Sequence, residues 1–227
     1  MNCLVCQTPT QSKGGHQWCP QCGLIKLNAP LNHDLNDYVK GYRALFDTDL
    51  EIRINMGRLA TIMKFVPLHK RIMDWGCSCG NFIARAEKYY ECVGYEPATL
   101  ASAYRTCTSN IVGDVDRISG KFDVITMFDV IEHFDNPRPA LTYIVSLLNV
   151  GSKLVIMTPD PHHFIDNLAG FYHLKPGEHA YMWSLDSLTR IMKEMGMDRI
   201  YYNYDEGIMR KNSGGTGDLL ASVFEKK

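Results

Sequence analysis

A glycine-rich turn between two acidic strand ends constrains this chain more than any other feature. An apolar segment ends at Asp74 and enters the turn Gly76-Cys-Ser-Cys-Gly80, and a second apolar segment ends at Glu96, 22 residues after Asp74. In open α/β sheets, ligands bind beyond the carboxyl ends of the strands, where a glycine-rich turn lets them approach the backbone. An acid that ends the second strand can accept hydrogen bonds from two ribose hydroxyls. The pattern therefore predicts a site for an adenosine-containing cofactor.

The spacing of the two glycines separates two classes of cofactor. Dinucleotide sites use the pattern G-x-G-x-x-G, which makes room for a pyrophosphate at a helix N-terminus. Here Gly76 and Gly80 enclose three other residues and follow an acid, so that pattern is not met. A strand ending in an acid and followed by G-C-S-x-G resembles the first motif of class I S-adenosylmethionine-dependent methyltransferases. The chain departs from the commonest form of that motif at Ser78, where glycine is usual.

The resemblance continues in the same order from about residue 50 to the end of the chain. Gly113-Asp114 resembles the segment after the third strand of that family, residues 122–133 its fourth-strand motif, and residues 151–159 its fifth strand. Residues 176–179 and 183–188 are similar to a subgroup that contains ubiquinone-pathway and sugar methyltransferases. The resemblance implies S-adenosylmethionine as the cofactor.

The resemblance also implies which residues bind the cofactor. Glu96 would accept from both ribose hydroxyls, Asp114 would accept from the adenine amino group, and the turn at Gly76 would receive the methionine portion. The full set that we expect is Asp74, Trp75, Gly76, Cys77, Gly80, Glu96, Pro97, Asp114, Val115, Phe128 and Asp129. The alternative role for each acid is that of a helix cap or turn residue.

Methyl transfer to a hydroxyl requires a group that takes the acceptor's proton. Histidine suits this task because its ordinary pKa lies near neutrality. Of the candidates His133, His162, His163, His173 and His179, we expect His133 and His179 to be catalytic, from their positions in the resembling segments. A structural or surface role is the alternative for each.

Apolar residues between 161 and 176 favour an amphipathic lid over the acceptor, the alternative being a helix at the edge of the core.

Two cysteine pairs near the N-terminus predict a metal site. Cys3-x-x-Cys6 and Cys19-x-x-Cys22 are separated by 12 residues. Two-residue gaps let each pair bend around one ion, and four thiolates complete a closed tetrahedral site, so we expect structural Zn²⁺. Iron and a disulfide pairing are the alternatives. The remaining cysteines, Cys77, Cys79, Cys92 and Cys107, are expected to be small buried residues.

The charge and the hydrophobic pattern of the chain limit the classes of molecule that it can bind. The net charge of −1 argues against nucleic acid and anionic membranes as partners, because those require a basic surface. No apolar run approaches the roughly 20 residues needed to cross a bilayer, and the N-terminus does not have the form of a secretory signal. We therefore expect a cytoplasmic protein with a small-molecule substrate, such as a sugar or glycan, and no membrane span.

The order of the expected elements predicts an α/β fold. Residues 1–28 would form a zinc ribbon, 29–49 a linker that enters a helix, and 50–227 a methyltransferase domain. Within this domain, strands are expected at 71–75, 91–96, 110–113, 122–129, 152–158, 198–205 and 217–225, with helices at 49–65, 81–90, 97–105, 137–148 and 184–195. Such alternation implies a Rossmann-like, mostly parallel sheet of seven strands that ends in an antiparallel hairpin. The hairpin loop, 209–217, is expected to be a solvated loop rather than a phosphate site.

Three functions compete at this level. The first is O-methylation of a sugar, nucleotide-sugar, glycan or other small-molecule hydroxyl, which the subgroup resemblance favours. The second is methylation of a nucleic acid or protein that the ribbon recognises. Only a thin basic and aromatic surface supports it, made of Lys13, His16, Trp18 and Lys26. The third, a non-catalytic cofactor-binding scaffold, has the least support because the cofactor motifs are intact.

Overall fold

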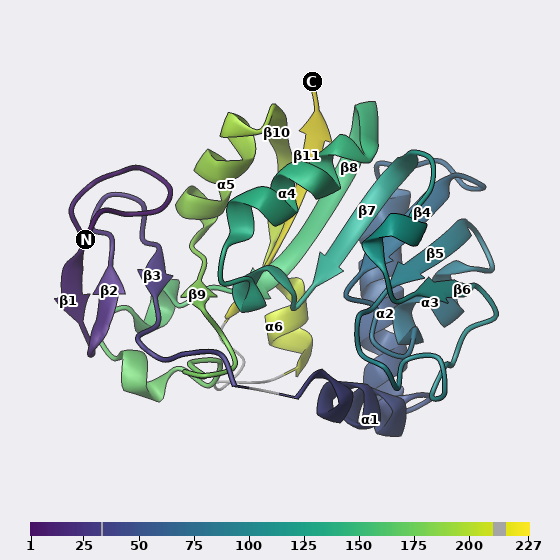
Figure 1. Ribbon diagram of the computed structural model, residues 1–227, viewed down its shortest axis with the longest axis horizontal. Helices are drawn as coiled ribbons and strands as arrows, with labels where there is room; N and C mark the ends of the chain where they lie inside the picture. The colour runs from purple at the N-terminus through teal and green to yellow at the C-terminus, as the bar shows by residue number, and fades with distance from the viewer. Residues whose placement is uncertain (33, 211–216) are drawn as a thin grey trace.

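The main body of the protein is a seven-stranded sheet. The computed structural model describes residues 1–32, 34–210 and 217–227. The strands are β4 (Arg71–Trp75), β5 (Glu91–Tyr95), β6 (Asn110–Val112), β7 (Phe122–Phe128), β8 (Leu148–Pro159), β10 (Met197–Asn203) and β11 (Leu219–Lys226). Their order across the sheet is β10-β11-β8-β7-β4-β5-β6 (Figure 1). The strands from β4 to β8 are parallel, and β11 is antiparallel to both of its neighbours, which confirms the predicted fold class.

Helices cover both faces of this sheet. They are α1 (Leu35–Leu45), α2 (Asp49–Met63), α3 (Asn81–Ala86), α4 (Pro137–Ser146), α5 (Leu185–Glu194) and α6 (Asp205–Arg210). Figure 1 shows α4 and α5 on one face and α2 and α3 on the other. Because successive side chains of a strand point to opposite faces, Ile125 and Met127 of β7 join the core under α4 and α5. Val124 and Phe128 join the core under α2 and α3.

Short-range signals explain where several helices begin. The Thr48 side chain caps α2 by accepting from the backbone N–H of Glu51. Ser184 and Ser187 form a reciprocal capping box at the start of α5. Pro137 opens α4, where its missing N–H removes no helical hydrogen bond.

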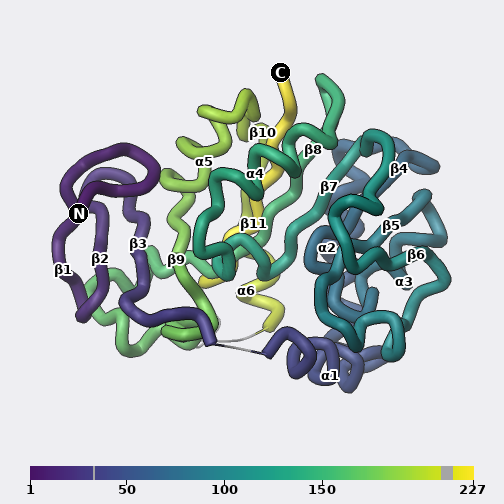
Figure 2. The backbone as a smooth tube through the Cα atoms, in the orientation of Figure 1, coloured from purple at the N-terminus to yellow at the C-terminus, as the bar shows by residue number. Residues whose placement is uncertain are grey.

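A second, smaller sheet joins the N-terminus to a distant segment. Its strands are β1 (Gln11–Lys13), β2 (His16–Trp18), β3 (Ile25–Lys26) and β9 (Tyr181–Met182), paired antiparallel in that order. The backbone trace shows the N-terminal segment lying beside the chain that leads into β9 (Figure 2). The pairing of β3 with β9 makes the segment before α5 part of the N-terminal sheet.

The helix expected at 97–105 is not present; the chain forms turns there. The N–H of Ala98 donates to the Glu96 carboxylate, and the N–H of Leu100 donates to the side chain of Asn36 in α1. These two donors would lack an intrahelical partner in a helix too. The bonds that follow, from the N–H of Ala101 to the carbonyl of Ala98 and from the N–H of Tyr104 to that of Leu100, differ in span and form turns instead of a continuous helical ladder.

The C-terminal strands pair antiparallel as predicted, but the expectation that no helix separates them is wrong. Helix α6 lies between β10 and β11 and contacts both β11 and α2. The predicted solvated loop falls largely on residues 211–216, which lie outside the described residues.

The lid segment expected at 161–176 has no long amphipathic helix. It contains two short 3-10 turns, η3 (His162–Phe164) and η4 (Leu168–Gly170), and Gly170, at the end of the second turn, disfavours a continuous helix. Its apolar residues Leu168 and Phe171 pack with Ile25, Leu27 and Met182 of the small sheet. Two further 3-10 turns, η1 (Val115–Arg117) and η2 (Ile131–His133), follow β6 and β7. Within the part of the chain that is described, no helix is both long enough and apolar enough to span a membrane.

Candidate active site

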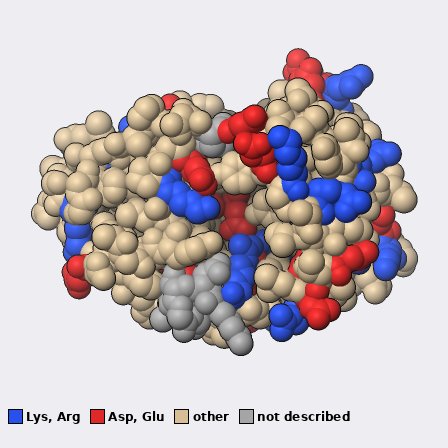
Figure 3. Space-filling view, turned by 90° about the horizontal axis from the view of Figure 1, so that it is seen from below, with Lys and Arg blue, Asp and Glu red and all other residues tan. Residues whose placement is uncertain are grey.

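A cavity of about 900 Å³ opens at the carboxyl ends of β4, β5 and β7. Figure 3 shows the hollow on this side of the molecule, with acidic and basic atoms next to each other inside it. Residues from α1, α2 and α6 and from the segment before β9 complete its wall. A volume near the upper end of the usual range, about 300 to 1,000 Å³, accommodates a cofactor together with a small second ligand.

The turn after β4 has the backbone geometry that the sequence predicts. Gly76 and Gly80 have φ angles of +75° and +88°. A Cβ atom on Gly76 would lie 2.6 Å from a methyl group of Val130, so a side chain is excluded there. Ser78 also has a positive φ, of 50°, which explains physically why glycine is usual at this position.

Glu96 holds this turn in place from the end of β5. Its two carboxylate oxygens accept from the backbone N–H groups of Ser78 and Ala98, each at 2.9 Å. Burial raises the pKa of Glu96, and the two backbone hydrogen bonds oppose that rise. Each carboxylate oxygen can accept a second hydrogen bond, so the residue can also bind hydroxyl groups in the cavity.

Asp74 lies under the same turn at the end of β4. Its Oδ1 accepts from the hydroxyl of Thr126 in β7 at 2.7 Å. Burial raises the pKa of Asp74 to about 7. A buried carboxyl of this kind favours a neighbouring positive charge.

Most of the predicted cofactor residues line the cavity, and three do not. The lining includes Asp74, Trp75, Gly76, Cys77, Glu96, Pro97, Phe128 and Asp129. Gly80 is buried beneath the turn, where a Cβ atom would lie 2.6 Å from the sulfur of Cys107. Asp114 and Val115 lie outside the lining, and Asp114 caps η1 by accepting from the N–H of Asp116.

The two predicted catalytic histidines come together in the part of the cavity wall formed by η2 and the segment before β9, which we call the acceptor end. The ring centroids of His133 and His179 are 4.7 Å apart, with the planes at 81°. Nδ1 of His133 lies 2.8 Å from the carbonyl oxygen of Glu178, and Nδ1 of His179 lies 3.0 Å from that of His173. Burial, and then the neighbouring His133, lower the pKa of His179 to about 3. His173 also lines the cavity, whereas His162 and His163 do not.

A buried cluster of four charges, of which the sequence indicated only Asp129, also contributes to the cavity wall. Arg58 of α2 and Arg210 of α6 both contact Asp129, at 3.4 and 2.8 Å. Both arginines also pair with Glu206, at 2.8 and 2.5 Å. Burial alone would raise the pKa of Asp129, but Arg210 and Arg58 outweigh it and lower that pKa to about 2. Asp129 is therefore held as an anion by protein cations, which differs from a residue poised for a ligand.

Glu132 is a second site residue that the sequence reasoning passed over. It precedes His133 directly, and its side chain is fully buried at the cavity wall. Burial, followed by the charge of Asp129, raises the pKa of Glu132 to about 8. An acid next to a candidate catalytic histidine was the available signal. Tyr38 and Tyr42 of α1 also line the cavity, in the segment that the sequence indicated as entering a helix that folds over the site.

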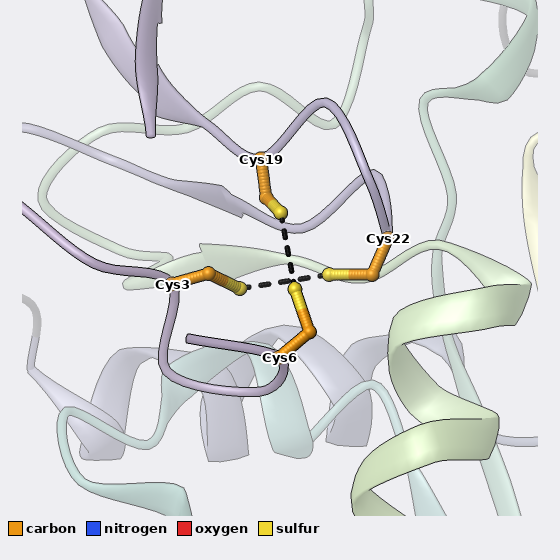
Figure 4. A group of neighbouring side chains, drawn as sticks. All are labelled: Cys3, Cys6, Cys19 and Cys22. Carbon is orange, nitrogen blue, oxygen red and sulfur yellow. Dashed lines mark hydrogen bonds between the residues drawn. The ribbon is translucent and has the colours of Figure 1, made fainter. Parts of the chain in front are cut away.

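The four N-terminal cysteines converge on one point between β1–β3 and the main body (Figure 4). The sulfurs of Cys3 and Cys22 are 3.5 Å apart, and those of Cys6 and Cys19 are 3.4 Å apart. Four sulfurs each about 2.3 Å from a tetrahedral Zn²⁺ would be separated by about 3.8 Å. The donor set therefore fits a structural zinc ion after a shift of a few tenths of an ångström. None of the chain's cysteines forms a disulfide in the described structure.

Comparisons with known structures agree with this architecture. The N-methyltransferase NodS from Bradyrhizobium japonicum, in complex with S-adenosylhomocysteine, is similar with a TM-score of 0.60 at 14% identity, over 86% of this chain and 99% of that one. A TehB-like S-adenosylmethionine-dependent methyltransferase from Corynebacterium glutamicum has a TM-score of 0.58 at 20% identity, over 85% and 98%. Magnesium protoporphyrin IX methyltransferase from Synechocystis, also with S-adenosylhomocysteine, has a TM-score of 0.60 at 16% identity, over 85% and 95%. At these identities the likeness shows the fold.

The family is shown by the sequence. A protein-family model described as a methyltransferase domain matches residues 51–201, which is well over half of the chain. No curated protein is similar enough to count as a relative. The matched region contains the glycine turn, Glu96 and the two histidines, so the family motif and the cavity coincide. The chain belongs to the methyltransferase-domain family and is an S-adenosylmethionine-dependent methyltransferase.

Proposed function

We propose that this methyltransferase methylates a hydroxyl group of a sugar, nucleotide-sugar, glycan or other small molecule. The observation that carries this proposal is the polar part of the cavity wall that includes His133, His179 and Tyr38. Such groups recognise hydroxyl-bearing ligands by hydrogen bonds. The resemblance of residues 176–179 and 183–188 to a subgroup with sugar and ubiquinone-pathway enzymes supports the same class.

For the cofactor, we assign the adenosine and methionine portions to the near end of the cavity. Glu96 accepts from the ribose hydroxyls while it keeps its two backbone donors. Asp74 balances the positive charge of the cofactor, and the turn at Gly76 receives the methionine portion. Asp114 accepts from the adenine amino group at the outer rim. The remaining residues of this proposed set are Trp75, Cys77, Gly80, Pro97, Val115, Phe128 and Asp129.

The catalytic residues in this proposal are His133 and His179, which act on the acceptor's proton. The sulfonium already activates the methyl group, so the protein has to align the acceptor oxygen with the S–CH₃ bond and help its proton to leave. We assign the acceptor to the space between these two rings and the methyl group, because the histidines and the proposed ribose contact Glu96 line the same cavity.

The walls of the cavity favour a small acceptor over a macromolecule. Helix α1 is tied across the mouth: the hydroxyl of Tyr38 donates to Glu178 at 2.7 Å, and the side chain of Asn81 donates to the carbonyl of Tyr42 at 2.6 Å. These contacts hold the two sides of the cavity together, which limits the size of what enters.

Two measurements test this function. Calorimetry should show S-adenosylhomocysteine binding in the low micromolar range or tighter, and no binding of NAD. Label from methyl-labelled S-adenosylmethionine should appear in small molecules or glycans of an extract, and glycosidase treatment should change the labelled fraction if the acceptor is a glycan. Label found only in protein or nucleic acid would reject a small hydroxyl acceptor.

The proposal includes one Zn²⁺ at Cys3, Cys6, Cys19 and Cys22. The closed set of four thiolates leaves no position for substrate, so the ion is structural. We expect one zinc per chain by elemental analysis of protein purified without chelator, and about none in Cys19→Ser. Stoichiometric iron instead of zinc, or no metal at all, would contradict this assignment.

A further inference from the structure

Three side chains at the acceptor end form a cluster whose composition suits a metal ion. Glu132, His133 and His179 each direct one potential ligand atom to the same place, and these atoms all lie within 4.8 Å of one another. Two of the residues come from η2 after β7, and the third precedes β9. All three line the cavity.

The hydrogen bonds of the two histidines define which ring nitrogen faces the cluster. Nδ1 of each ring contacts a backbone carbonyl oxygen, at 2.8 Å for His133 and 3.0 Å for His179. A carbonyl only accepts, so Nδ1 carries the proton and donates it. Nε2 therefore has the lone pair in both rings. Histidines that bind metals are oriented in this way, by a hydrogen bond from the other ring nitrogen.

Glu132 supplies the third donor and the strongest reason to expect a cation. Its Oε2 accepts from the hydroxyl of Thr158 at 2.9 Å. Its Oε1 is shielded from solvent and makes no hydrogen bond to any residue in the described part of the chain. A buried carboxylate oxygen without a partner destabilises the fold, and a bound cation removes that cost. Asp129 cannot supply the carboxylate ligand, because its side chain is already paired with Arg58 and Arg210.

We propose that Glu132, His133 and His179 bind one divalent first-row transition metal ion at the acceptor end of the cavity. Two histidines and one carboxylate leave further coordination positions open. A donor distance of about 2.0 to 2.2 Å requires the three atoms to be about 3 to 3.5 Å apart, so the side chains move inward by about 1 Å. The open positions face the cavity, where the acceptor hydroxyl and a neighbouring oxygen of the same molecule can bind. This inference rests on the proposed function, because it concerns the same acceptor.

In this arrangement the histidines act on the acceptor's proton through the cation instead of taking it themselves. The cation lowers the pKa of the bound hydroxyl, whose proton leaves to water. The acceptor oxygen then forms a bond to the methyl carbon. The S–CH₃ bond breaks with its electron pair on sulfur, which leaves a methyl ether and neutral S-adenosylhomocysteine. The preferred acceptor would carry two oxygens close enough to chelate one ion, such as a pair of adjacent hydroxyls.

Mn²⁺ is the probe that separates this site from the cysteine cluster. Oxygen and nitrogen donors suit Mn²⁺, whereas thiolates select zinc and iron. Full-length protein containing its ribbon metal is titrated with Mn²⁺ and followed by electron paramagnetic resonance. We expect one bound Mn²⁺ per chain, with magnetic coupling to two histidine nitrogens in the pulsed spectrum. The four cysteines have no nitrogen donor, so that coupling identifies the site without any measurement of activity.

Variants then assign the ligands. Glu132→Gln keeps the shape of the side chain and its bond with Thr158, and should weaken Mn²⁺ binding by more than about 100-fold, whereas the loss of an outer hydrogen-bond partner costs about 10- to 100-fold. His133→Asn should remove one nitrogen coupling. The exposed His163→Ala is the matched control and should bind Mn²⁺ like the parent. Mn²⁺ bound without nitrogen coupling, or bound equally well by Glu132→Gln, would overturn the proposal. If circular dichroism shows Glu132→Gln unfolded, the nitrogen count of His133→Asn decides.

The metal-site proposal and the proposed methylation of a hydroxyl can be rejected independently of each other. Calorimetry of S-adenosylhomocysteine is run on the same samples. Protein that binds the cofactor but no Mn²⁺ rejects the metal site and leaves the methyltransferase function standing. Protein that shows the nitrogen-coupled Mn²⁺ signal but transfers methyl groups only to nitrogen or carbon acceptors rejects the hydroxyl acceptor and leaves the metal site standing.

Discussion

The two ends of the cavity are built in different ways. At the cofactor end, Asp74, Gly76 and Glu96 all belong to one strand–turn–helix–strand unit, and the structure there depends largely on backbone conformation and backbone donors. The rest of the cavity wall, which includes the acceptor end, consists of side chains from α1, α2 and α6, from η2, and from the segment before β9. The first end is local in sequence, and the second is assembled from across the chain.

Cofactor binding is the property that members of the family share, and recognition of the acceptor is the property that distinguishes one member from another. A ligand held by backbone groups and strand-end acids tolerates change elsewhere in the fold, so one cofactor serves many enzymes. A wall of side chains from five segments can change its chemistry by a few substitutions without disturbing that cofactor. The comparison predicts that variants at the two ends affect different measurable quantities.

The largest expected effect is at the acceptor end. Replacing His133 with Asn or His179 with Gln should lower kcat by roughly 100- to 10,000-fold, because the acceptor's proton is no longer assisted. The affinity for S-adenosylhomocysteine should stay within about twofold, since neither residue belongs to the proposed cofactor set. Steady-state kinetics with the identified acceptor, together with calorimetry, measure both quantities.

His163→Ala, which is exposed and outside the cavity, controls for general effects of removing a histidine. Near-native turnover in both catalytic variants would remove the histidines from the mechanism. A parallel loss of cofactor affinity would show that the two ends are not independent. It would contradict the division of the cavity into a cofactor end and an acceptor end.

At the cofactor end we expect the reverse pattern from Glu96→Ala. The loss of hydrogen bonds to a charged group should weaken cofactor binding by about 1.5 to 3 kcal/mol, or roughly 10- to 150-fold. The matched control is Glu91→Ala, an exposed acid at the other end of the same strand, which should bind the cofactor like the parent. Calorimetry at several temperatures gives the comparison. Unchanged affinity in Glu96→Ala would exclude the ribose contact.

The smallest effect concerns the pH dependence of stability in the absence of cofactor. Burial raises the pKa of Asp74 to about 7, from about 3.9 in an unfolded chain. Between pH 4 and pH 7 the Asp74 carboxyl keeps its proton in the folded chain and loses it in the unfolded chain. The contribution of Asp74 to stability is therefore fully present below pH 4 and is lost as the pH rises through 7. Asp74→Asn stays neutral and should be more stable than the parent at pH 8 by roughly 1 to 3 kcal/mol, with little difference at pH 4.

Urea unfolding at both pH values measures this difference, and the exposed Asp116→Asn is the control. Parallel pH profiles for Asp74→Asn and the parent would mean that burial does not penalise the Asp74 carboxylate. The proposed role of this residue in balancing the positive cofactor would then lose its physical basis.

Much of the main sheet was predictable because its signals are local. The strand at Arg71–Trp75 was expected with the same limits, and α1, α2, α4 and α5 follow from helical spacing and caps. The errors come from long-range contacts. Turns replace the helix expected after Glu96, and the N–H of Leu100 in these turns donates to Asn36 of α1, 64 residues away. Helix α6 occurs where Arg58 of α2 pairs with Glu206, a partner 148 residues away.

The residues of the candidate site also fall into two groups, those with a local signal in the sequence and those that depend on long-range contacts. The glycine turn and Glu96 could be located from spacing, and His133 and His179 from resembling segments. The pairing of Arg58 and Arg210 with Asp129, and the buried oxygen of Glu132, could not be located. Spacing along a chain carries no information on which distant side chains meet when α2, α6 and η2 pack together.

The pairing of β3 with β9 has a consequence for the order in which the protein folds. The ribbon leaves the ribosome first, yet the strand that completes its sheet, Tyr181–Met182, is made more than 150 residues later. Contacts of such separation form slowly, because a long loop must close before they contribute. During synthesis, β3 is therefore an open strand edge with Ile25 and Leu27 still to be covered. Early metal binding by Cys3, Cys6, Cys19 and Cys22 would keep this segment compact until its partner strand has been made.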